Sequence, residues 1–224
     1  MMRLLYHLFL SPFCRKVRIA LAEKALPFEL KNENTAERRA EFLRLNPAGE
    51  VPVLVEPDGA VVCGAGPICE YLEEAFPDAV KLLPGSAATR AETRRLIEWF
   101  DGKFNREVTQ NLVGEKLMKR LLRAGEPDTT AIRAGQANIR VHLDYIGWLA
   151  ERRNWLAGDE FSLADVAAAA HLSCVDYLGD VPWDDFHPAR DWYARIKSRR
   201  AFRAVLADHI PGVPPPKHYA DPDF

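Results

Sequence analysis

The spacing of apolar residues changes once along the 224-residue chain, close to residue 85. Before that point, short apolar runs that predict strands alternate with stretches at helical spacing. The order is strand, helix, strand, helix, strand, strand, helix within about 76 residues. From about residue 88 to 206 every strong periodicity is helical, because apolar side chains recur every three or four residues. We therefore expect a small α/β domain followed by an all-helical domain.

Turn-forming and helix-breaking residues set the limits of these elements. In the first part we expect strands at 3–9, 28–31, 52–55 and 60–63, and helices at 15–24, 36–45 and 65–76. The last two strands are predicted to form a tight hairpin, because Asp58-Gly59 supplies the turn geometry. The expected domains are 1–78 (α/β), 79–87 (linker), 88–207 (all-helical) and 208–224 (extended arm). The arm is predicted because the last 14 residues contain five prolines.

The composition excludes several classes of protein. The chain carries 30 Lys plus Arg against 32 Asp plus Glu, so its net charge of −2 gives no global attraction to nucleic acid or an anionic membrane. The apolar runs are too short to span a membrane, and basic residues interrupt the start, unlike a signal peptide. The four cysteines show no CxxC pair or metal-ligand spacing. We expect a cytoplasmic, reduced protein with no metal site and no membrane insertion.

A helix start is predicted within the sequence FSLADV at residues 161–166. Ser162 can cap the free backbone donors, and Asp165, at the third helical position, can bond back to the cap residue. Phe161 and Val166 occupy the two hydrophobic staple positions. Such a cap contributes about 1 kcal/mol to stability. It is a folding device and carries no chemistry.

A second motif is NPAGEVPVL at residues 46–54. Its Val51-Pro52 bond lies between a glycine turn and a predicted strand. Because cis peptides occur almost only before proline, this bond is a good candidate for the cis form.

Together these motifs resemble the glutathione S-transferase superfamily. In that family NPxGxVPxL holds a cis-proline beside the thiol of glutathione, and GDxxSxAD is the capping box of the helical domain. Here the second motif stands as GDEFSLAD at 158–165, and SPFCRKVRIALAEK at 11–24 also fits. The resemblance covers residues 3 to about 205. It implies a thioredoxin-like α/β N-terminal domain, an all-α C-terminal domain and a homodimer.

The same resemblance points to two residues that would act if the chain were an enzyme. Ser11 occupies the family's position for the hydroxyl or thiol that acts on the glutathione sulfur. A serine hydroxyl can stabilise a thiolate by donating a hydrogen bond. Cys14 could instead form a mixed disulfide, since Arg15 and Lys16 beside it at a helix N-terminus favour a thiolate. The alternatives are an N-cap role for Ser11 and a small buried apolar role for Cys14.

The chain departs from the family pattern before its third predicted helix. The family usually places an acidic residue or Gln, followed by Ser, where this chain has Gly64 and Ala65. Those side chains bind the γ-glutamyl group of glutathione, so two hydrogen bonds to charged groups are lost. Each is worth about 1.5–3 kcal/mol, which predicts a roughly 10²–10⁴-fold loss of affinity. With the backbone of Val51 and Pro52, these residues form what we expect to be a vestigial glutathione site.

Two hypotheses follow. In one the chain is a glutathione transferase, with glutathione as its cofactor and Ser11 stabilising the thiolate. In the other it has lost tight glutathione binding, needs no cofactor and binds a protein. The absent acid–Ser pair and the short C-terminal arm resemble the FtsZ-localised, transferase-like division proteins of alphaproteobacteria. That resemblance implies a dimer that binds the FtsZ polymer and promotes constriction during cell division.

Two regions are expected to contact such a partner. Residues 90–123 hold nine Lys plus Arg against five Asp plus Glu. Because an acidic protein could use this excess, Lys116, Lys119 and Arg120 are candidate contacts. The arm combines aromatic and charged side chains on a proline-rich segment, and a preformed extended segment suits recognition. Its candidate contacts are Lys217, Tyr219, Asp221, Asp223 and Phe224. The alternatives are a solvated helix face and a tail folded back over the protein.

Overall fold

The computed structural model describes residues 2–122 and 124–221. Its N-terminal part is built on a four-stranded sheet with the order β2-β1-β3-β4. The strands are β1 (Arg3–His7), β2 (Phe28–Asn32), β3 (Val53–Val55) and β4 (Val61–Cys63). β1 pairs in parallel with β2, whereas β1–β3 and β3–β4 are antiparallel. The predicted hairpin is thus present as β3 and β4, joined by the turn that contains Gly59 with φ +93°.

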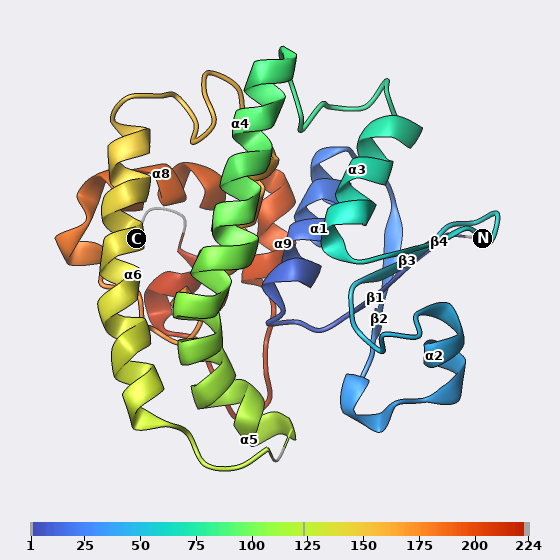
Figure 1. Cartoon of the computed structure of the whole chain (residues 1–224), viewed down its shortest axis with the longest axis horizontal. Helices are drawn as coiled ribbons and strands as arrows, with labels where there is room; N and C mark the ends of the chain where they lie inside the picture. The colour runs from blue at the N-terminus through green and yellow to red at the C-terminus, as the bar shows by residue number, and fades with distance from the viewer. Residues whose placement is uncertain (1, 123, 222–224) are drawn as a thin grey trace.

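Four helical segments accompany the sheet. They are α1 (Pro12–Glu23), η1 (Thr35–Glu37), α2 (Ala40–Leu45) and α3 (Ala65–Ala75). The predicted helix 36–45 is divided into η1 and α2, because Arg38 between them adopts the left-handed conformation. α1 starts earlier than predicted, since Pro12 suits the first helical turn and Ser11 caps it. Figure 1 shows α1 and α3 on the side of the sheet that faces the helical domain.

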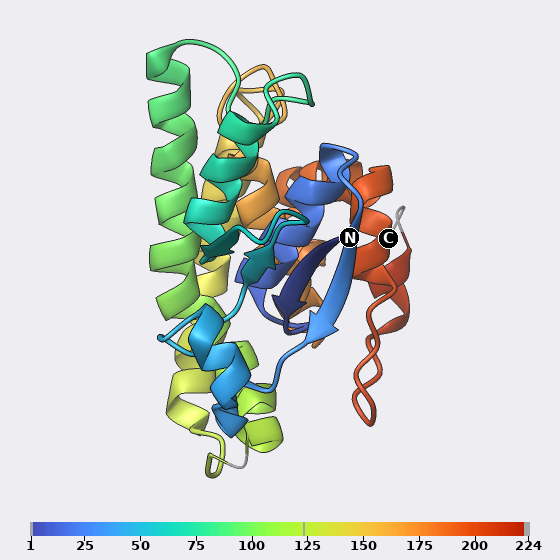
Figure 2. The ribbon, with the colours of Figure 1, turned by 90° about the vertical axis from the view of Figure 1, so that its right-hand side faces the viewer.

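The C-terminal part is helical, as predicted. Its segments are α4 (Ala87–Glu98), η2 (Trp99–Met118), α5 (Lys119–Leu122), α6 (Thr129–Ala150), α7 (Leu163–Asp176), η3 (Trp183–Asp185), α8 (His187–Lys197), η4 (Arg200–Phe202), α9 (Arg203–Leu206) and η5 (Lys217–Ala220). Figures 1 and 2 show α4, η2 and α5 as one long helix beside α6. All 14 residues of α7 are buried, so this helix is the centre of the domain. α7 also packs on α1 and joins the two domains into one core.

The middle of the long helix is π-helical rather than α-helical. Phe100, Phe104, Val108 and Leu112 recur every four residues there, and all four are fully buried. An α-helix has 3.6 residues per turn, so a strict interval of four drifts around it. In the π-helical part, backbone amides bond to the carbonyl of the fifth preceding residue.

Both local motifs have their predicted conformations. The Val51-Pro52 peptide bond is cis. In the capping box, Ser162 Oγ accepts from the amide of Ala164 at 3.3 Å, and Asp165 Oδ2 accepts from the amide of Ser162 at 3.2 Å. Asp165 Oδ1 also accepts from the amide of Leu156 and from the indole of Trp192, both at 2.9 Å. The capping residue therefore also ties the preceding loop and α8 to α7.

The C-terminal segment is anchored to the protein rather than extended along its whole length. The prolines at 214–216 are followed by η5, a single helical turn that contains no proline. Tyr219 in this turn is fully buried, donates to the carbonyl of Val205 at 3.2 Å and packs its ring against Tyr177. Tyr177 in turn donates to the carbonyl of Val213 at 2.7 Å. The expectation of an extended arm is therefore wrong for 217–220.

Candidate functional site

The first candidate site is the N-terminus of α1. Ser11 is the N-cap of that helix, and its hydroxyl accepts from the amide of Cys14 at 3.3 Å. The Sγ atom of Cys14 accepts from the amide of Leu8 at 3.4 Å. The predicted N-cap role of Ser11 is thus confirmed. Its half-buried hydroxyl keeps a proton available for a second hydrogen bond.

The surroundings of Cys14 do not favour a thiolate, which argues against the mixed-disulfide hypothesis and agrees with the alternative of a small buried apolar role. The side chain is fully buried, and burial raises the pKa of its thiol to about 11. Arg15 and Lys16, which were expected to lower that pKa, point into the helical domain. Arg15 donates to Asp208 Oδ2 at 3.2 Å, and Lys16 forms an ion pair with Asp101. Cys14 is therefore a neutral thiol in the core at neutral pH.

The second part of the site is the loop that carries the cis-proline. Asn46 Nδ2 donates to the carbonyl of Glu50 at 2.8 Å and closes this loop from the end of α2. The carbonyl of Pro52 accepts from the amide of Gly64 at 2.9 Å, so the start of α3 lies against the cis-proline. The structure brings Pro52 and Gly64 together as the resemblance implied. In the described ranges no hydrogen bond joins Ser11 to either of them.

The N-terminus of α3 lacks the side chains that would hold a γ-glutamyl group. Gly64 is its N-cap, with φ +86°, and Ala65 is its first helical residue. Neither has a polar side-chain atom. The free amides of the first turn remain, and the helix dipole favours an anion there. The helix start can therefore attract a carboxylate only through its backbone.

A small cavity lies along α3. A cavity of about 100 Å³ lies between α3 and α4 and is lined in part by Gly66, Lys16 and Arg94. Its lining includes none of the transferase-type site residues, which are Ser11, Val51, Pro52, Gly64 and Ala65, so this cavity is not part of that site. Within the described residues there is no cluster of three or more His, Cys, Asp or Glu suited to a metal ion. In the same part of the chain, no helix combines the length and apolar character needed to span a bilayer.

The three cations predicted to contact a partner differ in exposure and in whether a carboxylate pairs with them. Lys116 pairs with Asp180 at 2.5 Å, and Lys119 pairs with Glu115 at 2.6 Å. Arg120 in α5 is exposed. Much of the basic character predicted for this segment is thus neutralised by neighbouring carboxylates.

The predicted contacts in the arm divide in the same way. Lys217 and Asp221 are exposed, as a contact surface requires. Tyr219 is fully buried against Tyr177, so it cannot contact a partner without undocking, contrary to the expectation. Asp223 and Phe224 lie outside the described residues.

Sequence reasoning missed the ion pairs that join the two domains. Asp208 Oδ2 accepts from Arg18 Nη1 at 2.7 Å and Oδ1 from Nη2 at 2.8 Å, while Arg15 reaches the same carboxylate. All three side chains are buried. The only available signal was the density of basic residues in a helix with an otherwise apolar face, and it did not identify the partner.

Two family models match the chain. One, described as the N-terminal domain of glutathione S-transferase, covers residues 5–80, and the other, described as its C-terminal domain, covers residues 110–200. Together they include the cis-proline loop, the start of α3 and the capping box.

Similar proteins extend the match over the full length. FtsZ-localized protein A from Caulobacter vibrioides is 50% identical over 225 residues, which cover 99% of this chain and 98% of that protein. The crystal structure of a glutathione S-transferase from Rhodospirillum rubrum matches with a TM-score of 0.97 and 57% identity, covering 100% of both chains. The structure of FzlA from C. crescentus matches with a TM-score of 0.96 and 50% identity, again over 100% of both. Fold, motifs and relatives agree, and the chain belongs to the glutathione S-transferase family.

Proposed function

We propose that this protein is a regulator of bacterial cell division that associates with the FtsZ polymer and does not depend on glutathione. The observation that carries the proposal is the 50% identity to FtsZ-localized protein A across 99% of the chain. The proposal includes a homodimer in the cytoplasm, since dimers are typical of the family.

The geometry of the transferase-type site supports a role without glutathione. Gly64 and Ala65 offer no side-chain contact to a γ-glutamyl group. Cys14 is buried with its pKa raised to about 11, which disfavours a thiolate chemistry at neutral pH. A chain without these contacts retains the fold as a scaffold for binding another protein.

Four observations favour a second candidate, a glutathione transferase. The amides at the start of α3 are free to bind a carboxylate, the cis-proline is in place, and Ser11 has a half-buried hydroxyl. In addition, the structure from Rhodospirillum rubrum that is 57% identical bears the name glutathione S-transferase. In this alternative Ser11 donates a hydrogen bond to the glutathione thiolate, while Val51 supplies backbone contacts to the tripeptide.

The proposed partner contacts on the helical domain are Lys116, Lys119 and Arg120. Lys116 and Lys119 pair with carboxylates, whereas Arg120 is exposed. In the arm the proposed contacts are Lys217 and Asp221, both exposed.

Two measurements on the purified protein test the proposal. Sedimentation with FtsZ filaments assembled with GTP should carry the protein into the pellet, and unassembled FtsZ should not. Calorimetric titration with glutathione should show no binding tighter than millimolar. Micromolar affinity for glutathione that Ser11→Ala abolishes, together with no sedimentation, would establish the transferase instead.

A further inference from the structure

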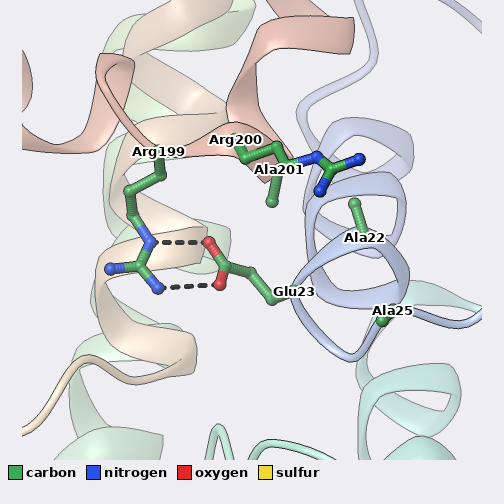
Figure 3. Close-up of a pocket in the computed structure, with 6 residues that line it drawn as sticks. All are labelled: Ala22, Glu23, Ala25, Arg199, Arg200 and Ala201. Atoms are coloured by element: carbon green, nitrogen blue, oxygen red, sulfur yellow. Dashed lines mark hydrogen bonds and ion pairs between the residues drawn. The ribbon is translucent and has the colours of Figure 1, made fainter.

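A groove lies between the carboxyl end of α1 and the segment that follows α8 (Figure 3). Its volume is about 580 Å³, and its lining comes from Ala22, Glu23, Ala25, Arg199, Arg200 and Ala201. The three alanines contribute only methyl groups, so the charged part of the lining is one glutamate and two arginines. None of these residues belongs to the transferase-type site.

One of the two arginines is already held in place. Arg199 donates from Nε to Glu23 Oε1 at 2.6 Å and from Nη2 to Oε2 at 2.7 Å, as the dashed lines in Figure 3 mark. Its guanidinium also lies 3.8 Å from the centre of the Phe161 ring. Such a two-pronged pair fixes both side chains. Because Glu23 is neutralised in this way, it does not repel an incoming carboxylate.

The second arginine has no such partner. Arg200 is exposed, and its guanidinium makes no hydrogen bond or ion pair with any residue in 2–122 or 124–221. Figure 3 shows its side chain directed across the groove toward α1, away from the Arg199–Glu23 pair. The charge of the groove lining is therefore +1, and Arg200 carries it.

The surface next to the groove has the same sign. Residues 192–207 contain five Lys plus Arg and no Asp or Glu. Arg195 and Arg203 in this stretch are exposed, and Arg203 follows Arg200 by three residues, a spacing that places both on one side of a helical turn. A ligand with two anionic groups could therefore contact Arg200 with one group and Arg203 with the other.

We propose that this groove is a docking site for an acidic polypeptide segment, with a carboxylate on Arg200, a second on Arg203 and small apolar side chains against the alanines. The inference rests on the proposed function, since the partner that presents this segment is the FtsZ polymer. Charge complementarity selects the occupant: the groove is basic, whereas the chain as a whole carries −2 and so does not attract polyanions in general.

The test compares four proteins for binding to GTP-assembled FtsZ filaments by quantitative sedimentation at two salt concentrations. They are the unaltered protein, Arg200→Glu, Arg200→Glu with Arg203→Glu, and Arg133→Glu. Arg133 on α6 is a matched control, because it is also an exposed helical arginine without an ion pair among the described residues. We expect the double reversal to weaken binding about 10- to 100-fold and to flatten its salt dependence, while Arg133→Glu stays within about two-fold of the unaltered protein.

The outcomes separate this inference from the function on which it rests. If the unaltered protein does not sediment with filaments, the proposed function fails and this site fails with it. If it sediments and the double variant sediments equally well, the groove is not the docking site, although the proposed function stands. Equal losses in Arg133→Glu would also overturn the inference, since the effect would then come from net charge alone. Thermal unfolding of each variant verifies its fold, and Arg200→Gln repeats the test without reversing the charge. A change in molar mass by light scattering in the double variant would instead identify a second copy of this chain as the occupant.

Discussion

The helical domain carries two basic segments, residues 90–123 and residues 192–207, whose cations have different surroundings. In the first, carboxylates follow or precede the cations within about one helical turn, as Glu115 does for Lys119 at 2.6 Å. In the second there is no Asp or Glu, so each cation must reach another element or remain in solvent, as Arg200 does. An exposed pair contributes little to stability, but it also cancels the charge that a partner could use.

The second segment uses its cations in three ways. Lys197 is buried and donates to the carbonyl of His218 at 2.8 Å, which holds the C-terminal turn. Arg199 forms the wall of the groove with Glu23. Arg200 extends from the surface. The number of nearby Asp and Glu residues, and not the number of cations, therefore decides which basic segment keeps unpaired positive charge for a partner.

The largest expected effect comes from the first acid after the second segment. Asp208 faces the core and pairs with both Arg15 and Arg18. In Asp208→Ala two buried guanidinium groups lose their carboxylate, so the free energy of unfolding should fall by about 3–5 kcal/mol. Urea unfolding followed by circular dichroism measures it.

The matching change for the first segment is Asp180→Ala, which removes the carboxylate that pairs with Lys116 of that segment. That pair is partly exposed, with 30% of the lysine side chain accessible, so the loss should be about 1 kcal/mol or less. If Asp208→Ala and Asp180→Ala lowered the free energy of unfolding equally, the two ion pairs would not differ in burial, contrary to the structure.

The sequence was informative wherever a short motif determines its own conformation. The capping box at Ser162, the cis bond before Pro52 and the element order of the first domain all depend on residues a few positions apart. The ion-pair partners of the basic side chains in α1 could not be predicted in the same way. Arg18 and Asp208 are 190 positions apart, and only the packing of α1 on the helical domain brings them together.

The arm illustrates the same limit. Its prolines correctly excluded a long helix, but the burial of Tyr219 depends on the ring of Tyr177, 42 positions earlier, and on a carbonyl in α9. Within the candidate site, the replacement of polar residues by Gly64 and Ala65 was evident from the motif alone. The raised pKa of Cys14 was not, because it comes from burial rather than from the neighbours in sequence.

A second prediction sharpens the contrast by freeing another cation in the second segment. Glu23→Gln removes the carboxylate that holds Arg199 and raises the charge of the groove lining from +1 to +2. Binding to FtsZ filaments should become about three- to ten-fold tighter at low salt, with the gain shrinking at high salt. Sedimentation at two salt concentrations measures it. Glu92→Gln, which removes the carboxylate paired with Arg95 of the other segment and with Arg153, is the matched control and should leave binding unchanged.

A third prediction concerns the first segment directly. Arg120→Ala removes its exposed cation at the end of the long helix, whereas Lys116→Ala removes a cation that Asp180 already neutralises. If Arg120 is a secondary contact, its removal should weaken binding to filaments by at most about three-fold, and that of Lys116 by less. A loss from Arg120→Ala larger than that from Arg200→Ala would transfer the docking site from the second segment to the first.

The smallest expected effect is a pH dependence in how stably the C-terminal arm stays docked. The arm contacts the second segment through Lys197, which donates to the carbonyl of His218. Hydrogen bonding to Asp176 at 3.0 Å raises the pKa of His218 above its usual 6.5, while Lys197 and Arg190 nearby act to lower it. Since the folded-state pKa is the higher one, this contribution is fully present below pH 6.5 and is lost as the pH rises through the raised value. His218 is 36% exposed, so screening keeps the contribution below about 1 kcal/mol.

Hydrogen exchange at the amide of Tyr219 measures this effect, with rates corrected for the intrinsic pH dependence of exchange. Protection should decrease from pH 6 to pH 9, and His218→Gln should remove that slope while leaving Tyr219 buried. The amide of Lys119 in the first segment provides the comparison, because no histidine contacts its ion pair with Glu115. A slope that persists in His218→Gln would mean that the arm responds to another titrating group, and docking of the arm would then be independent of the Asp176 contact.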